Sequence, residues 1–350
     1  MTQEERKVIE RLNTDGMIDL AQRLIRIKTV NPPGDYLEIS KVLHLEMQKM
    51  GLRVEIIEGY PGKINVFGIL PGYEANGVTF LLSGHMDVVS VGDQKEWTHD
   101  PFGGEIYDGR LWGRGSIDMK SAIAAELFAV KAVMDSRVPL RGTVMIGGTV
   151  DDEIAGVWGM KYFLDYGFAS KNLPMPSIHL LGEPSHLNIT CSFKGRLWFK
   201  VTTTGKPAHG GAPHEGVNAI EKMMTLIPEF KNIPKLNHPL MGEDTLNLGT
   251  IEGGEKVNVV PSRCTAHFDF RMCAPGNGDV SESLLRGAIK DLMSKDRDFQ
   301  IMDLEIYEKR DPIEIQSDHE VIRRMVECVK GVTGRKPQFI GSLSAGDLYY

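Results

Sequence analysis

The sequence predicts an α/β protein, with a three-layer domain built on a mixed sheet and a smaller inserted domain of the ferredoxin-like type. Over residues 1–190, strand-like apolar runs alternate with helical patterns, which is typical of layered α/β folds. Residues 191–306 follow the order strand, helix, strand, strand, helix, strand, the βαββαβ arrangement of a ferredoxin-like unit. A chain of 350 residues is longer than one domain core usually supports, so two domains are expected.

The first elements follow from periodicity and from helix-breaking residues. A helix over 17–28 should end before the Asn31-Pro32-Pro33-Gly34 turn, because proline cannot continue a helix. A second helix over 36–50 should be capped by Gly51. The other elements expected in this part are strands over 54–57, 65–70, 78–82, 141–149 and 177–181 and a helix over 122–134.

The inserted domain has its own set of elements. They are expected as strands over 193–204, 246–251, 263–270 and 299–306 and as helices over 216–230 and 280–293. A helix over 320–330 then returns the chain to the larger domain, so residues 1–190 and 307–350 form one discontinuous domain. Such an insertion implies a hinge and hence a lid, and the free edge strands of the inserted sheet, residues 191–306, predict that the lid dimerises.

Composition and charge exclude several kinds of partner. The formal net charge is -7 and no block of Lys or Arg stands out, so nucleic acid is not expected as a partner. No apolar run is long enough to span a membrane, and the charged N-terminus is unlike a secretory signal. The four cysteines show no CxxC spacing, which indicates reduced thiols and a cytoplasmic location.

A histidine and a carboxylate follow the apolar run Leu81-Leu82 two residues apart. His85 and Asp87 lie on the same side of an extended segment. A metal-ligating imidazole usually donates its other ring N–H to an oxygen acceptor, and Asp87 would suit that role. Taken alone, the pair is more typical of an ordinary histidine at a strand end, since short motifs carry false positives.

Three acidic stretches downstream also follow strand-like runs or precede a helix. Asp118 stands just before the helix over 122–134, where a plain helix cap is the alternative. Asp151, Asp152 and Glu153 are consecutive and repel one another unless a cation or a proton compensates; a solvated acidic turn is the alternative there. A fourth carboxylate, in Gly182-Glu183-Pro184, follows the strand over 177–181. Together these residues predict a metal site at strand ends.

The combination HxD, DMK, DDE and GEP, followed by GKPAHGGAPHEGVNA, resembles the zinc-dependent aminoacylase and exopeptidase family that includes acetylornithine deacetylase and succinyl-diaminopimelate desuccinylase. The resemblance covers essentially the whole chain. It implies a catalytic domain with two Zn²⁺ ions, for which Co²⁺ or Mn²⁺ could substitute, and a ferredoxin-like lid that forms a homodimer. By position it implies these metal ligands: His85 on one zinc, Asp118 bridging both, Glu183 completing the first site and Glu153 binding the second.

The same resemblance implies the catalytic and substrate-binding residues. Asp87 would orient His85, and Asp152 falls where the family carries its general base, although the usual residue there is Glu. His209 matches a lid histidine that reaches the partner's site and stabilises the oxyanion; an ordinary loop histidine is the alternative. Asn258 and Arg271 match positions that bind the substrate carboxylate, for which a guanidinium is well suited.

One ligand of the family pattern is missing. The family's last zinc ligand is a histidine near the C-terminus, and these 350 residues end before that motif. His319 is not a substitute, because it stands at the start of the helix over 320–330. We therefore expect either a truncated catalytic domain or a second zinc site that lacks one ligand.

These observations predict a metallo-amidohydrolase that acts on linear amides or peptides. The expected reaction is cleavage of an N-acyl amino acid, as in a deacetylase or desuccinylase of amino-acid metabolism, with water activated by two metals and a carboxylate general base. A dipeptidase or carboxypeptidase with the same chemistry is the alternative enzyme. A catalytically weak homologue that binds amino acids or peptides is the alternative from a different class.

Overall fold

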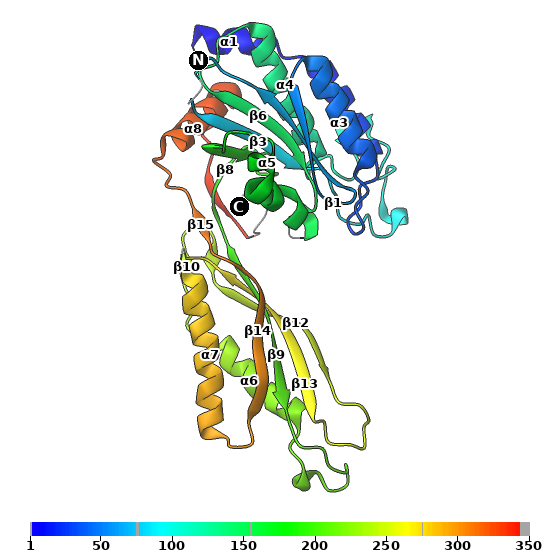
Figure 1. Cartoon of the computed structure of the whole chain (residues 1–350), viewed down its shortest axis with the longest axis vertical. Helices are drawn as coiled ribbons and strands as arrows, with labels where there is room; N and C mark the ends of the chain where they lie inside the picture. The colour runs from blue at the N-terminus through cyan, green and yellow to red at the C-terminus, as the bar shows by residue number, and fades with distance from the viewer. Residues whose placement is uncertain (1, 75–76, 155, 275, 344–350) are drawn as a thin grey trace. The chain divides into compact units, whose positions relative to one another are not determined.

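The computed structural model describes residues 2–74, 77–154, 156–274 and 276–343 (Figure 1). The described residues form two compact units, one up to Leu187 and the other from Asn188 onward. The domain division predicted from the sequence, with 1–190 and 307–350 against 191–306, stays a prediction. Residues 344–350 of its last segment lie outside the described part of the chain.

The first unit is built on a five-stranded mixed sheet. The strands lie in the order β1-β2-β6-β3-β7; their bounds are β1 (Arg53–Tyr60), β2 (Lys63–Leu70), β3 (Thr79–His85), β6 (Thr143–Thr149) and β7 (Ile178–Leu181). β3 runs parallel to both β6 and β7, whereas β2 pairs antiparallel with β1 and with β6. The predicted mixed sheet is therefore confirmed, and the carboxyl ends of three parallel strands meet at one edge.

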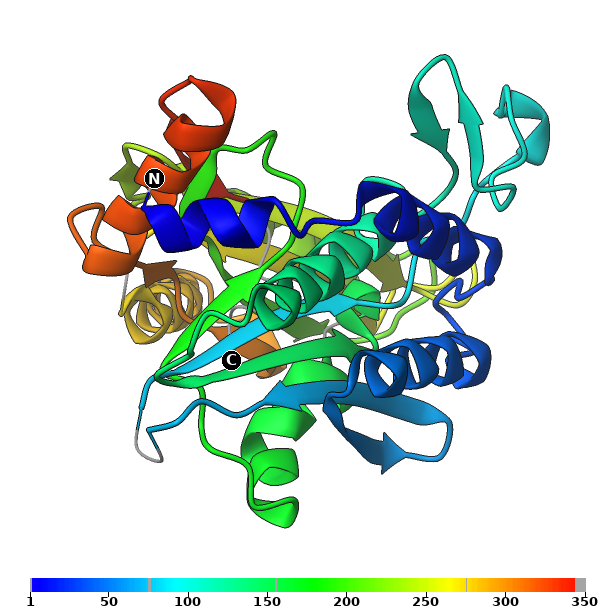
Figure 2. The ribbon, with the colours of Figure 1, turned by 90° about the horizontal axis from the view of Figure 1, so that it is seen from above.

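Helices cover both faces of this sheet, as Figure 2 shows from above. One face carries α2 (Thr14–Arg26), α3 (Leu37–Met50) and α4 (Lys120–Ser136); α1 (Gln3–Ile9) packs against α4. Their apolar sides bury a core that includes Leu43, Ile123 and Ile146. The opposite face carries η3 (Val157–Lys161), η4 (Phe163–Gly167) and α5 (Phe168–Ser170), where Phe163 stacks on Phe67. The predicted three layers are therefore present.

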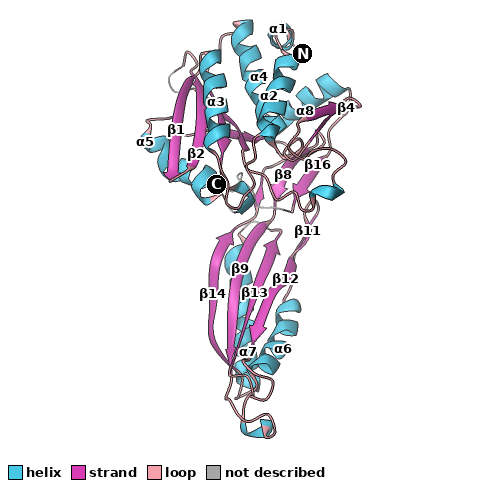
Figure 3. Ribbon diagram, turned by 90° about the vertical axis from the view of Figure 1, so that its right-hand side faces the viewer, coloured by secondary structure: helices cyan, strands magenta, loops and turns pink. Residues whose placement is uncertain are grey.

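The second unit contains a four-stranded antiparallel sheet in the order β12-β13-β9-β14 (Figure 3). Its elements are β9 (Gly195–Thr204), α6 (Ala219–Lys231), β12 (Thr245–Gly253), β13 (Arg263–Met272), α7 (Asn277–Lys295) and β14 (Gln300–Arg310). Both helices pack on one face of the sheet, over a core in which Phe199 and Phe268 stack and Phe230 meets them edge-on. The predicted βαββαβ order is confirmed.

The sequence prediction missed the shortest elements. They are the hairpin β4 (Glu105–Tyr107) and β5 (Arg110–Trp112), the pair β10 (Asn237–His238) and β11 (Gly242–Glu243), and the sheet β15-β8-β16, made of β8 (Ile189–Phe193), β15 (Ile313–Glu314) and β16 (Phe339–Ser342). Strands of two to five residues are too short to show a reliable period. The predicted last helix is present as α8 (Glu320–Thr333). Among the described residues, no helix is long and apolar enough to cross a membrane.

Candidate metal centre

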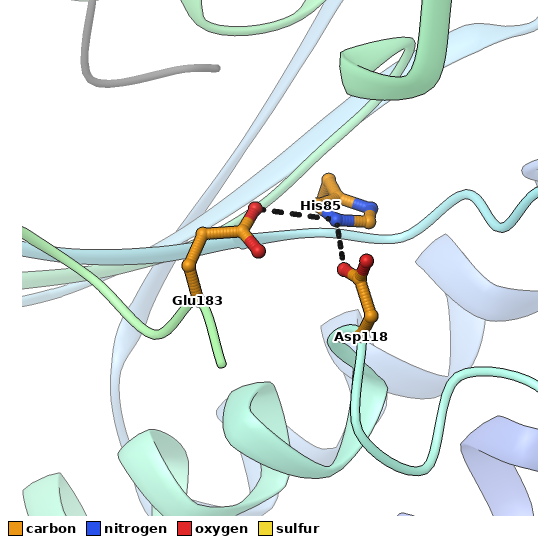
Figure 4. Close-up of side chains that lie close together, drawn as sticks. All are labelled: His85, Asp118 and Glu183. Carbon is orange, nitrogen blue, oxygen red and sulfur yellow. Dashed lines mark hydrogen bonds and ion pairs between the residues drawn. The ribbon is translucent and has the colours of Figure 1, made fainter. Parts of the chain in front are cut away.

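Three of the predicted ligands lie together at the carboxyl edge of the first sheet (Figure 4). His85 ends β3, Asp118 stands before α4, and Glu183 follows β7. His85 Nε2 lies 2.9 Å from Asp118 Oδ1 and 3.4 Å from Glu183 Oε1. The three residues each offer one ligand atom within 4.8 Å of the others. Residues almost a hundred positions apart thus converge because β3 and β7 are parallel neighbours, the arrangement in which α/β sheets build their sites.

The structure decides between the two interpretations of Asp118. The cap position of α4 is Met119, and no side chain caps this helix end. Asp118 is half exposed and directs a carboxylate oxygen at His85. The plain helix-cap interpretation of Asp118 is therefore wrong.

His85 is held with one ring nitrogen turned toward the two carboxylates. Its side chain is buried, and Nδ1 lies 2.9 Å from the backbone carbonyl oxygen of Asp87. A carbonyl can only accept, so Nδ1 donates, and Nε2 is the nitrogen available to a metal. The Asp87 carboxylate lies farther away, at 3.6 Å from Nδ1. The backbone of Asp87 makes the orienting contact, and the role predicted for its side chain stays a prediction.

Asp152 and Glu153 lie close enough to influence this centre electrostatically. They belong to the turn η2 (Asp152–Ile154), and the charge of Asp152 raises the pKa of both His85 and Glu183. Burial raises the pKa of Glu153 to about 7, and the carboxylates of Asp118, Asp87 and Asp152 add to that shift. The roles predicted for Asp152 as base and for Glu153 as metal ligand stay predictions.

At this centre several carboxylates surround one imidazole, and these neighbouring groups shift one another's pKa values. Burial would lower the pKa of His85, but its contacts with Asp118 and Glu183 outweigh burial and raise it well above the ordinary value. The contact with His85 lowers the pKa of Asp118, whereas burial and neighbouring charges raise that of Glu183. A cation would relieve this repulsion, and a set of one imidazole and several carboxylates suits Zn²⁺. The residues present therefore fit a metal centre.

Asp151 takes a different place from its two acidic neighbours. It is 1% exposed, and its Oδ1 accepts hydrogen bonds from Lys63, Tyr36 and Asn31 at 2.8, 2.9 and 3.1 Å. The solvated-turn interpretation is wrong for this residue. Sequence reasoning assigned Asn31 only to a helix-ending turn, and no spacing signal pointed to Tyr36 or Lys63 as partners of an acid more than eighty residues away.

A buried lysine next to the centre was also missed. Lys120 is fully buried, and its ammonium donates to the backbone oxygens of Leu24 and Ile27 at 3.1 and 2.6 Å. Burial lowers the pKa of Lys120 to about 7. Lys120 ties the start of α4 to the end of α2 and so fixes the segment that carries Asp118.

The second unit does not bring its three predicted residues together. His209 and Asn258 lie side by side, since His209 bridges to Val259 and the backbone N–H of Gly210 donates to the carbonyl of Asn258. Arg271 stands near the far end of β13, eight extended residues from the start of this strand, which is a distance of roughly 25 Å. There it forms a two-pronged ion pair with Asp269. Within one chain, Asn258 and Arg271 therefore lie too far apart to contact the same small carboxylate. Their separate roles stay predictions.

A layered α/β unit with a histidine–carboxylate centre at its strand ends, accompanied by a βαββαβ unit, is the arrangement of metal-dependent peptidases and amidohydrolases. Residues 81–349 match the model of peptidase family M20/M25/M40, and the chain belongs to this family. The family and the hydrolase class predicted from the sequence are thereby confirmed.

Individual relatives agree with this assignment. The chain is 33% identical to succinyl-diaminopimelate desuccinylase 2 of Ruegeria over 265 residues, which cover 73% of this chain and 64% of that protein. The chain thus spans slightly less than two thirds of that relative. Its fold is similar to aminopeptidase PepT from Bacillus cereus, with a TM-score of 0.77 at 20% identity, covering 97% of this chain and 87% of the other. It is also similar to the metallo-carboxypeptidase Sso-CP2 from Sulfolobus solfataricus, with a TM-score of 0.72 at 18% identity, covering 100% and 88%.

Proposed function

We propose that this chain hydrolyses the amide bond of an N-acyl amino acid, with a succinyl or acetyl group as the acyl part. The observation that carries the proposal is the His85 centre, where one buried imidazole nitrogen faces carboxylates from two distant segments. Membership of family M20/M25/M40 and a relative named as a desuccinylase support the same type of bond. A cytoplasmic location is part of the proposal, in keeping with four cysteines that form no disulfide.

The donor set suits two zinc ions. His85, Asp118 and Glu183 would hold one ion, and Asp118 with Glu153 would hold the other. Such ions, when bound, polarise a scissile carbonyl and lower the pKa of water. The first set offers three donor residues and the second only two, so we expect the second ion to bind more weakly than the first.

Asp152 is the proposed general base. Its carboxylate would take the proton from the attacking water and pass it to the leaving amine, which is the usual task of such a group. Its charge already acts on His85, Glu153 and Glu183, which supports a position beside the reacting atoms.

The residues of the second unit are proposed to act on substrate in two different copies of the chain. Arg271 would exchange Asp269 for the substrate carboxylate, and His209 would stabilise the oxyanion in a partner's site. The length of β13 between these residues supports this division, because one small substrate cannot span roughly 25 Å. A homodimer through residues 191–306 follows from the proposal.

A panel of substrates tests the function. Protein stripped of metal and reloaded with zinc would be offered N-succinyl and N-acetyl amino acids and unblocked dipeptides, with release of free amine as the readout. We expect turnover of an acyl amino acid that rises with zinc content up to two ions per chain. Turnover of dipeptides alone would favour the dipeptidase alternative, and binding without turnover at full zinc occupancy would favour the weak binding homologue.

A further inference from the structure

The three consecutive acids of the turn after β6 divide into two groups. Asp152 and Glu153 influence the metal centre, whereas the Asp151 carboxylate is surrounded by donors from elsewhere. Lys63 supplies its ammonium at 2.8 Å and is itself only 15% exposed. Tyr36 supplies its hydroxyl at 2.9 Å and is fully buried. An acid buried with a cation and hydrogen-bond donors is compensated, and losing any one of them leaves it poorly solvated.

Asn31 links this buried acid to the strand that carries His85. Its side-chain Nδ2 donates to Asp87 Oδ2 at 2.8 Å and to Asp151 Oδ1 at 3.1 Å. The same Asp87 oxygen accepts the backbone N–H of Glu153 at 3.2 Å. One amide group therefore joins the exit of β3 to the acidic turn.

The segment around Asn31 is fixed to the chain just after His85. The Asn31 backbone N–H donates to the carbonyl of Val88 at 2.9 Å, and Val88 donates back to Thr29 at 3.1 Å. The Thr29 hydroxyl donates to the carbonyl of Met86 at 2.6 Å. These bonds leave the Asn31 amide little freedom, so it can hold both carboxylates at a set separation.

The backbone at Asp151 also requires such support. Asp151 has a φ of 65°, in the left-handed region that is rare for residues other than glycine. Its carbonyl accepts from the N–H groups of Ile154 and Gly156 at 3.1 and 2.6 Å and so closes the turn. Strained conformations of this kind persist where the surroundings over-determine them.

We propose that Asn31, Tyr36 and Lys63 act as positioning residues that clamp Asp151 and thereby aim Asp152 and Glu153 at the metal centre. This inference rests on the proposed function, in which Glu153 binds the second metal and Asp152 is the base. Asp151 is an anchor rather than a base. Because the hydrogen bond that orients His85 comes from the backbone of Asp87, whereas the Asp87 carboxylate lies farther away at 3.6 Å, the clamp acts on the second metal site far more than on the first.

Zinc titration of Asn31→Leu tests this inference without a substrate. Metal-free protein is titrated with zinc against a competing chelator, and two affinities are obtained. We expect the weaker affinity to fall by about 10–100-fold, the usual cost of losing a group that supports a ligand, and the stronger one to change less than about threefold. Thr203→Val is the matched control, because it removes a buried hydroxyl that bonds to Ala219 and Cys264 in the other unit; it should leave both affinities unchanged. Equal weakening of both sites, or no change in either at full folding, would overturn the clamp.

Lys63 offers a second pair of variants in case Asn31→Leu does not fold. Lys63→Met leaves Asp151 without its cation and should weaken the second zinc by at least about tenfold, whereas Lys63→Arg keeps the charge and should stay within about threefold of wild type. Equal affinities of the two variants would contradict the clamp. Since these readouts need no turnover, a protein that hydrolyses none of the amides offered would count against the proposed function and leave this inference standing.

Discussion

The two units differ in how their sheets place residues that are distant in the sequence. In the first unit, β3 and β7 are parallel, so residues that leave their carboxyl ends, His85 and Glu183, meet at one edge. In the four-stranded sheet of the second unit every neighbouring pair of strands is antiparallel. Asn258 precedes β13 and Arg271 lies near its far end, so the two residues stand at opposite ends of this strand. The parallel strands therefore bring their residues together at one edge, whereas the antiparallel sheet leaves Asn258 and Arg271 at two separate ends, which we propose act on substrate in different copies of the chain.

The largest effect is expected from removing the residue on which the first unit's centre depends. Asp118→Ala should abolish activity and lower zinc content from about two ions to less than one, because Asp118 is proposed to bridge both metals. That loss should exceed the roughly 10–100-fold cost of losing an outer partner of a ligand. Elemental analysis of the purified variant measures it. Asp135→Ala, at the other end of α4 and paired only with Lys131 among the described residues, is the control; two fully bound metals in Asp118→Ala would exclude the bridging role.

A smaller effect is expected where the chemistry changes and the metal site does not. Asp152→Asn should lower kcat by at least about a hundredfold, the scale of general acid–base catalysis, with zinc content unchanged. The variant Asp152→Glu has the side-chain length of the residue that is usual in the family, and it should keep or raise kcat. If Asp152→Asn keeps near-normal kcat at full zinc occupancy, another group must accept the proton of the attacking water. Asp151 is then a poor candidate, because it is buried and its Oδ1 already accepts hydrogen bonds from Lys63, Tyr36 and Asn31.

The second unit offers a test of whether its two ends serve different copies. His209→Ala subunits mixed with Asp118→Ala subunits should regain about a quarter of wild-type activity, since half of randomly paired dimers would hold one intact site. Each variant alone should be far less active. Native mass spectrometry would verify the mixed dimers. A mixture no more active than the sum of its parts would place His209 in its own subunit's site or outside catalysis.

Much of the fold was predictable because its signals are local. The βαββαβ order and the helices α3 and α4 follow from periodicity and from breakers such as Gly51, which adopts the left-handed conformation expected of a cap. The grouping of His85, Asp118 and Glu183 was predictable from motifs at strand ends. The partners of Asp151 were not, because Asn31, Tyr36 and Lys63 reach it only through tertiary packing. The distance between Asn258 and Arg271 was also not predicted. A motif match suggests a role for each residue but does not give the length of the strand between them.

The smallest effect contrasts one buried glutamate from each unit. Glu126 on α4 is 8% exposed, and neither carboxylate oxygen has a hydrogen-bond partner among the described residues. Burial raises its pKa well above the ordinary value of 4.5. Glu308 on β14 is partly buried as well, but hydrogen bonds from Arg196 and Arg310 outweigh burial and lower its pKa. The two groups should therefore couple stability to pH with opposite signs.

The direction of each effect follows from which state binds the proton more tightly. Folded Glu126 holds its proton at a pH where the unfolded chain has lost it, so its ionisation costs stability as pH rises above about 4.5. Folded Glu308 stays ionised where the unfolded chain is protonated, so its contribution is present above about 4.5 and is lost as pH falls. Glu126→Gln should thus raise the free energy of unfolding by about 1 kcal/mol near pH 8 and by less near pH 5, whereas Glu308→Gln should lower it by about 1 kcal/mol at both values. Denaturant unfolding at the two pH values measures both variants. A destabilised Glu126→Gln at pH 8 would mean that its carboxylate has a partner in solution, and the contrast between an uncompensated acid in one unit and a compensated acid in the other would fail.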